Sequence, residues 1–182
     1  LTKLTKDVTV HTNLGDKTVS VSGYIGEQLK VLVPTVDGYT SDKTTITATV
    51  NTDGSITIDN PDTDGYVTYT ANSTTASASF TTPIGTQKVS VTGNVGDTVT
   101  LTVPQVDGYS TDKSTVTGVI NADGTITLND TVTYTAEAQD YWLSITAPDG
   151  TQVKVVHIQG NTGDKVVIQP YVSSYCNYLV TN

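Results

Sequence analysis

The 182-residue sequence has no arginine and no methionine, and it has only one cysteine, one tryptophan and one phenylalanine. Lysine supplies all 9 positive charges against 18 carboxylates, which gives a net charge of −9. An acidic chain without arginine lacks the cations that displace counterions from nucleic acid or attract an anionic bilayer. We therefore expect neither a nucleic acid partner nor membrane insertion of this fragment.

Further absences narrow the class of protein. The only cysteine, Cys176, cannot form an internal disulfide, so no disulfide framework marks the chain as secreted. No segment is long and apolar enough to span a bilayer, and no signal peptide opens the sequence. We interpret the chain as an internal fragment of a longer protein whose targeting signals lie elsewhere.

What the chain has in abundance is β-branched threonine, with 37 residues, and valine. Both suit a pleated strand better than a helix. Apolar residues alternate with polar ones, as at Ile46, Ala48 and Val50, and Gly, Pro, Asn and Asp separate the runs. No segment has a convincing helical period, so the pattern predicts a mostly β protein of small sheets with little or no helix.

The alternation is organised as an internal repeat with an offset of 70 residues. Residues 19–39 read VSVSGYIGEQLKVLVPTVDGY, and residues 89–109 read VSVTGNVGDTVTLTVPQVDGY. A third, weaker copy begins near Tyr141, lacks Asp-Gly-Tyr and has Pro170 one position early. We predict a first repeat at 1–73, a second at 74–137 and a partial or degenerate third at 138–182.

The predicted linkers between these repeats, at 72–77 and 137–140, are short. A unit of about 60–70 residues buries a marginal core, so contact with its neighbours would help to stabilise each repeat. We therefore expect an elongated, end-to-end arrangement.

The order of the motifs carries a family resemblance. Each full repeat runs V-T/S-G-x-x-G-D/E, then V-P-x-V-D-G-Y, then x-D-K, and closes on V-T-Y-T-A. This order resembles the mucin-binding (MucBP) repeats of cell-wall-anchored adhesins of Gram-positive bacteria, over roughly residues 7–71 and 77–136 and more weakly over 141–182. The resemblance implies a fold related to the β-grasp of ubiquitin, usually with a helix, and binding to mucin glycoproteins or, in some members, immunoglobulins.

These observations together predict a non-catalytic segment of an extracellular, cell-surface adhesin. It would bind host mucin glycans weakly at each repeat and gain avidity along the array, with neighbouring repeats as further partners. One alternative is a purely structural stalk that projects a distal binding domain from the cell wall. Another is the accessory region of a surface hydrolase.

Tyrosine is the main aromatic residue and the best candidate for contact with a sugar, whose apolar face stacks on an exposed ring. Tyr39 and Tyr109 follow glycine in the repeated loop, where packing at the end of a small core is the competing interpretation. Packing is favoured more strongly for Tyr69 and Tyr134. Tyr24 and Tyr66 have no tyrosine counterpart in the second repeat, and we expect them to be exposed glycan candidates.

Acidic residues raise the question of calcium. Asn60, Asp62 and Asp64 imitate the start of a calcium loop, but the acidic residue expected later in such a loop is absent, and we favour a solvated turn. Asp53 and Asp123 lie in Asn-x-Asp-Gly hairpins, where we expect the carboxylate to bind turn backbone rather than metal. We expect no cofactor.

The sequence gives little support to catalysis. His11 and His157 occupy non-equivalent places in different repeats, and Cys176 has no histidine near it in the sequence. No nucleophile elbow, zinc or phosphate-loop pattern is present. Lys43 and Lys113 are repeated, but we interpret each Asp-Lys pair as exposed turn chemistry rather than as an isopeptide donor.

Overall fold

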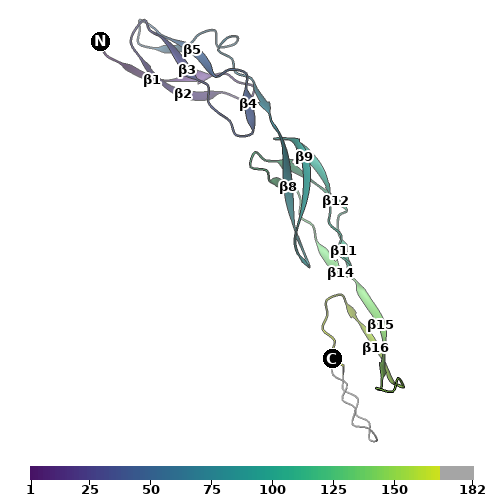
Figure 1. Ribbon diagram of the computed structural model, residues 1–182. Coiled ribbons are helices and arrows are strands. Elements are labelled where there is room, and N and C mark those ends of the chain that lie inside the picture. The colour runs from purple at the N-terminus through teal and green to yellow at the C-terminus, as the bar shows by residue number, and fades with distance from the viewer. Residues whose placement is uncertain (169–182) are drawn as a thin grey trace. The chain divides into compact units, whose positions relative to one another are not determined.

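The computed structural model describes residues 1–168, and every regular element in this range is a strand (Figure 1). The expectation of an all-β chain of small sheets is thereby confirmed. With no helix in this part of the chain, it also contains no helix that could cross a membrane. Cys176, Pro170 and the remainder of the predicted third repeat lie outside the described residues.

The first repeat contains a hairpin of β1 and β2, a three-stranded sheet in the order β3-β5-β6 and a two-stranded sheet of β4 and β7. All of these pairs are antiparallel. The strands are β1 Leu4–Val10, β2 Lys17–Gly23, β3 Gln28–Leu32, β4 Tyr39–Ser41, β5 Thr45–Val50, β6 Ile56–Ile58 and β7 Tyr69–Ala71.

Residues 73–136 form the same set of sheets: a β8-β9 hairpin, a sheet in the order β10-β12-β13 and a β11-β14 pair. A further antiparallel hairpin of β15 and β16 follows. The strands are β8 Ser73–Thr82, β9 Gly85–Asn94, β10 Thr98–Thr102, β11 Tyr109–Thr111, β12 Thr115–Ile120, β13 Ile126–Leu128, β14 Tyr134–Ala136, β15 Ala138–Thr146 and β16 Gln152–Asn161.

The core of the first repeat follows from the period of two. Alternate residues of β1 and β5 point inward, so that Val10, Ala48 and Val50 are almost completely inaccessible to solvent while the threonines between them face outward. Residues from β3, β6 and β7 complete this core, including Val31, Ile58 and Tyr69. A small core of this kind depends on each of its large side chains.

The Asp-Lys pair has a structural role beyond that of an exposed turn. Lys43 Nζ lies 3.0 Å from Asp42 Oδ2 and donates to the Tyr66 carbonyl at 2.6 Å, while Asp42 Oδ1 accepts the Thr68 N–H. In the second repeat, the equivalent pair at 112 and 113 makes the same kinds of contact. Each pair therefore fixes the segment that leads into the closing strand.

The expected linkers are shorter than the sequence analysis predicted, which is a correction. Residues 73–77 belong to β8 and residues 138–140 belong to β15, so that only Asn72 and Glu137 separate the flanking strands. Strands β4 and β11 were not predicted, because three residues after Asp-Gly are too few to establish alternation.

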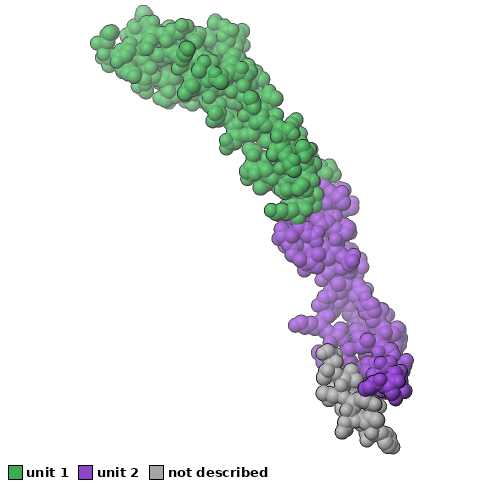
Figure 2. All heavy atoms as spheres, in the orientation of Figure 1, with its two compact units in different colours: residues 1–78, 88–100, 117–129 green, residues 79–87, 101–116, 130–182 purple. Residues whose placement is uncertain are grey.

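The chain divides into two compact units, and the division falls inside the second repeat (Figure 2). One unit comprises residues 1–78, 88–100 and 117–129, and the other comprises residues 79–87, 101–116 and 130–182. The boundaries predicted from the repeats, at 73 and 137, stay a prediction.

Candidate functional site

Tyr39 and Tyr109 are half-buried, and each lies beside a glycine of the segment that follows it. Tyr39 packs against the core of the first repeat, and its hydroxyl lies 3.2 Å from where a Cβ atom on Gly96 would stand. The Tyr109 hydroxyl lies 3.0 Å from the corresponding position on Gly163. Both rings therefore make contacts within the chain, which agrees with packing better than with a free sugar platform.

The other tyrosines of the two full repeats differ in exposure. Tyr69 is buried, and its hydroxyl donates to the Pro34 carbonyl at 2.5 Å. Tyr134 makes the equivalent bond to Pro104 at 2.8 Å, and burial raises the pKa of both phenols. Tyr24 is exposed in the turn after β2 and Tyr66 is half-buried, so Tyr24 is the more accessible glycan candidate of these two.

The segment that imitates a calcium loop forms a hydrogen-bonded turn. The Asn60 carbonyl accepts from the N–H groups of Thr63 and Gly65, and the Asn60 side-chain amide donates to Asp64 at 3.3 Å. Asp62 is exposed in the same turn. Among the described residues, no group of three or more acidic, histidine or cysteine side chains is arranged to hold a metal ion.

The carboxylates of the Asn-x-Asp-Gly hairpins bind backbone, as expected. Asp53 Oδ1 accepts the Ser55 N–H at 2.9 Å, and Asp123 Oδ1 accepts the Thr125 N–H at the same distance. The hydrogen bonds from the Ser55 and Thr125 hydroxyls, followed by those from the backbone N–H groups, lower the pKa of both carboxyl groups.

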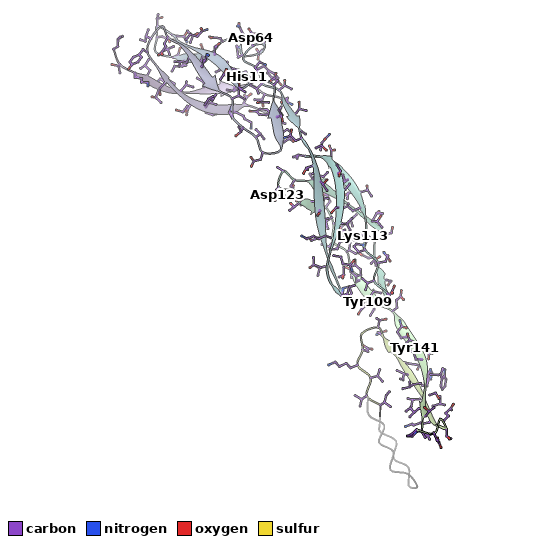
Figure 3. All side chains as sticks on the ribbon, in the orientation of Figure 1. His11, Asp64, Tyr109, Lys113, Asp123 and Tyr141 are labelled. Carbon is purple, nitrogen blue, oxygen red and sulfur yellow. The ribbon has the colours of Figure 1, made fainter. Side chains whose placement is uncertain are left out.

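His11 forms a pair within the first repeat, where Figure 3 labels it near the loop that carries Asp64. Its Nδ1 lies 2.7 Å from Asp16 Oδ1, and the hydrogen bond to this carboxylate raises the histidine pKa. Asp62 adds a smaller electrostatic contribution in the same direction. The pair is exposed, with 40% of the His11 side chain and 62% of the Asp16 side chain accessible to solvent.

The first two hairpins carry hydroxyl groups that pair across their strands. Thr5 Oγ1 lies 2.7 Å from Ser22 Oγ across β1 and β2. Across β8 and β9, Thr75 pairs with Thr92 at 2.9 Å and Ser77 pairs with Ser90 at 2.8 Å. Cross-strand hydroxyl pairs stabilise a sheet but present no ring to a ligand.

The third hairpin replaces these hydroxyls with aromatic and charged side chains. Trp142 pairs with His157 across β15 and β16, and the two rings stack with centroids 4.1 Å apart and planes inclined by 3°. Asp140 lies two residues before Trp142 on the same face and accepts hydrogen bonds from His157 Nε2 and Gln159 Nε2. We call these four residues the Trp142 platform.

The Trp142 platform has the chemistry of a small carbohydrate site. The Trp142 side chain is 70% exposed although it lies flat on a histidine, so an apolar sugar face can stack on the indole. Asp140 and Gln159 can bind sugar hydroxyls beside it. The hydrogen bond from His157 lowers the Asp140 pKa, which keeps this carboxylate an acceptor in mildly acidic solution.

The opposite face of the same hairpin borders a cleft of about 530 Å³. Tyr141, which is labelled in Figure 3 and is 60% exposed, lines it together with Asp107, Glu137 and Gln139. The Tyr141 hydroxyl donates to Gln139 Oε1 at 3.0 Å. The β15-β16 hairpin thus presents aromatic and hydrogen-bonding groups on both faces.

Trp142 and Tyr141 were not predicted as site residues, because neither is shared with the second repeat. The signal that could have indicated them is a difference between the repeats. The third repeat has a run of Tyr141, Trp142 and Leu143 where the second repeat has Ala76, Ser77 and Ala78. No family model matches the chain, and the search of curated proteins likewise found no match.

Proposed function

We propose that this chain is a non-catalytic segment of a bacterial cell-surface adhesin that binds host mucin glycans. The observation that carries the proposal is the Trp142 platform, an exposed indole stacked on His157 with a carboxylate and an amide beside it. Tryptophan is enriched at binding interfaces, because its ring is apolar and its N–H is polar, and a flat ring with neighbouring acceptors suits a sugar.

The wider setting in the proposal is a tandem array of β-grasp-related repeats, anchored to the cell wall through other regions and joined end to end. The offset of 70 residues and the recurrence of the same three kinds of sheet support the array. The relation to the β-grasp and to MucBP repeats depends on the motif resemblance. Weak binding by single sites would give useful attachment through avidity along a longer array.

The purely structural stalk is the second candidate. It is favoured by Tyr39 and Tyr109, the repeated aromatic residues, because both contact a following segment of the chain rather than standing free. The two candidates differ in one respect, since a stalk needs no exposed aromatic platform and a glycan-binding segment does.

Binding of the full 182-residue chain to immobilised mucin tests the proposal. Loss of the stacking surface in Trp142→Ala is expected to weaken binding roughly tenfold, equivalent to about 1.4 kcal/mol. Ile84→Ala is the matched control, because Ile84 is equally exposed, at 70%, in the turn of the second hairpin. It is expected to bind like the wild type.

Enzymatic removal of the mucin glycans should abolish the signal. If the wild-type chain fails to bind mucin, the stalk is the better account. If Trp142→Ala binds as well as the wild type, the chain binds mucin through another surface and the assignment to the Trp142 platform is wrong.

A further inference from the structure

The first two repeats are joined through the backbone of one residue. The Asn72 N–H donates to the Gly38 carbonyl at 2.8 Å, and the Asn72 carbonyl accepts the Val95 N–H at 3.0 Å. The Val95 methyl groups lie 2.9 Å from where a Cβ atom on Gly38 would stand, and Val95 is only 9% exposed. The Asp-Gly-Tyr loop at 37–39 therefore receives the turn at 93–96 directly against its backbone.

The same joint recurs at the third hairpin. The Glu137 N–H donates to the Gly108 carbonyl at 2.8 Å, and the Glu137 carbonyl accepts the Thr162 N–H at 2.9 Å. Thr162 side-chain atoms lie 2.6 Å from where a Cβ atom on Gly108 would stand. The Asp-Gly-Tyr loop at 107–109 thus receives the turn at 160–163.

The two joints share the features that allow a Gly-x-x-Gly turn to pack against an Asp-Gly-Tyr loop. Gly38 and Gly108 have φ values of 80° and 79°, where glycine is favoured, and the absence of a side chain lets the turn approach closely. The hydrogen bonds use backbone groups, so the residue at the contact can be Val95 in one joint and Thr162 in the other. A compact residue in a Gly-x-x-Gly turn is the shared feature.

The first repeat has the same turn without the corresponding loop. Ile25 occupies the place of Val95 in the Gly23–Gly26 turn, yet it is 52% exposed, and its neighbour Tyr24 is 41% exposed. The internal bonds of the turn are already formed, because Gly26 N–H donates to Val50 and Glu27 N–H donates to Tyr24, as in the second repeat. The Ile25 N–H has no acceptor among the described residues.

We infer that the turn at Tyr24 and Ile25 is a docking surface for the Asp-Gly-Tyr loop of another repeat of this kind, joined ahead of it in the chain. Ile25 has an exposed apolar side chain and, within the described part of the chain, an unpaired N–H. In the first joint, the Val95 side chain packs against Gly38 of the loop, and the Val95 N–H donates to the Asn72 carbonyl. Both Asp-Gly-Tyr loops of the present chain already hold a turn, so a second copy of the chain offers no free loop. The occupant is therefore a preceding repeat, and the inference is independent of mucin binding.

An extended protein tests this inference. A copy of residues 1–72 is fused ahead of Lys3, so that the copied Asn72 takes the place of Thr2, which is its equivalent at the offset of 70. Hydrogen exchange of the Ile25 amide is then compared by NMR in the extended and original chains. Exchange in the extended chain should be slower by roughly tenfold or more, because a hydrogen-bonded amide exchanges only when the joint opens.

The Val95 amide is the internal reference, since its joint is present in both proteins. Ile25→Asp provides the control: it should leave the folding of the original chain unchanged, because the side chain is exposed, and should remove the protection of the residue 25 amide in the extended chain. An Ile25 amide that exchanges equally fast in both proteins would overturn the inference. Lack of protection at Val95 would also overturn it, because the joint on which it is based would not persist in solution.

Discussion

The hairpins β8-β9 and β15-β16 occupy equivalent places after a single linker residue, yet the side chains of β8 and β15 differ in burial. In β8, Ala76, Ala78 and Phe80 are buried, and the outward hydroxyls pair across the strands. In β15, Tyr141 is 60% exposed and Trp142 70% exposed. The same backbone hairpin therefore serves packing in one place and presents rings to solvent in the other.

The repeat pattern therefore identifies architecture, while departures from it identify candidate recognition residues. Residues that recur, such as Tyr39 and Tyr109, contact neighbouring segments of the chain. The residues that carry the proposed function do not recur, because the second hairpin has Ser77 where the third has Trp142.

The largest expected effect concerns stability. Phe80→Ala should lower the free energy of unfolding by about 3–5 kcal/mol, because Phe80 is only 3% exposed and its removal leaves a cavity. Trp142→Ala should lower the free energy of unfolding by less than about 1 kcal/mol, since the substitution removes one stacking contact with His157 and little buried area. Thermal melts followed by circular dichroism measure both. Equal losses in the two variants would show that Trp142 is a packing residue.

An intermediate effect concerns the pH dependence of mucin binding. Sialylated and sulfated mucins are anionic, and this chain has a net charge of −9, so long-range repulsion opposes their encounter near neutral pH. At about pH 4–5, part of the Asp and Glu population is protonated and the repulsion weakens. Binding should therefore be tighter than at pH 7.4, provided that Asp140, with its lowered pKa, stays ionised.

Binding assays at the two pH values, each at low and moderate salt, check this expectation. Near neutral pH, salt should strengthen binding or leave it unchanged, because screening acts beyond about 10 Å at 0.1 M ionic strength. Tighter binding at pH 7.4 that weakens sharply with salt would indicate attraction through lysines and would contradict the repulsion argument.

The general fold could be predicted from the sequence because its signals are local. Alternation at Ile46, Ala48 and Val50 predicted a strand with an inward face, and the structure buries all three. The turn at 51–54 was equally predictable, since Asp and Gly have well-defined roles in such hairpins. Alternation does not require knowledge of distant partners.

The candidate site could not be predicted in the same way, because it depends on pairing at a distance. Tyr141, Trp142 and Leu143 form a continuous apolar run, so alternation does not indicate that both rings are exposed or which face of the hairpin each ring occupies. The stacking of Trp142 on His157 depends on the cross-strand register, which a single-residue slip would abolish. The joints at Asn72 and Glu137 likewise link segments that are far apart in the sequence.

The smallest expected effect concerns the titration of Asp140. The hydrogen bond from His157 lowers its pKa, so its stabilising contribution is present above the ordinary Asp value and is lost as the pH falls through the lowered pKa, below about pH 4. His157→Ala should move the Asp140 pKa back toward its ordinary value. NMR titration of the side-chain carboxyl measures this, and an unchanged midpoint would show that His157 does not hold the carboxylate.

The most direct test of the central claim uses the fluorescence of Trp142, which is the only tryptophan of the chain. Titration of the wild-type chain with soluble mucin O-glycans should change its emission saturably, because a sugar stacked on the indole displaces water from an exposed ring. By calorimetry, the same glycans should bind the Trp142→Ala chain roughly tenfold more weakly than the wild-type chain. Equally tight binding to both chains, with no change in the emission of Trp142 in the wild type, would contradict the account.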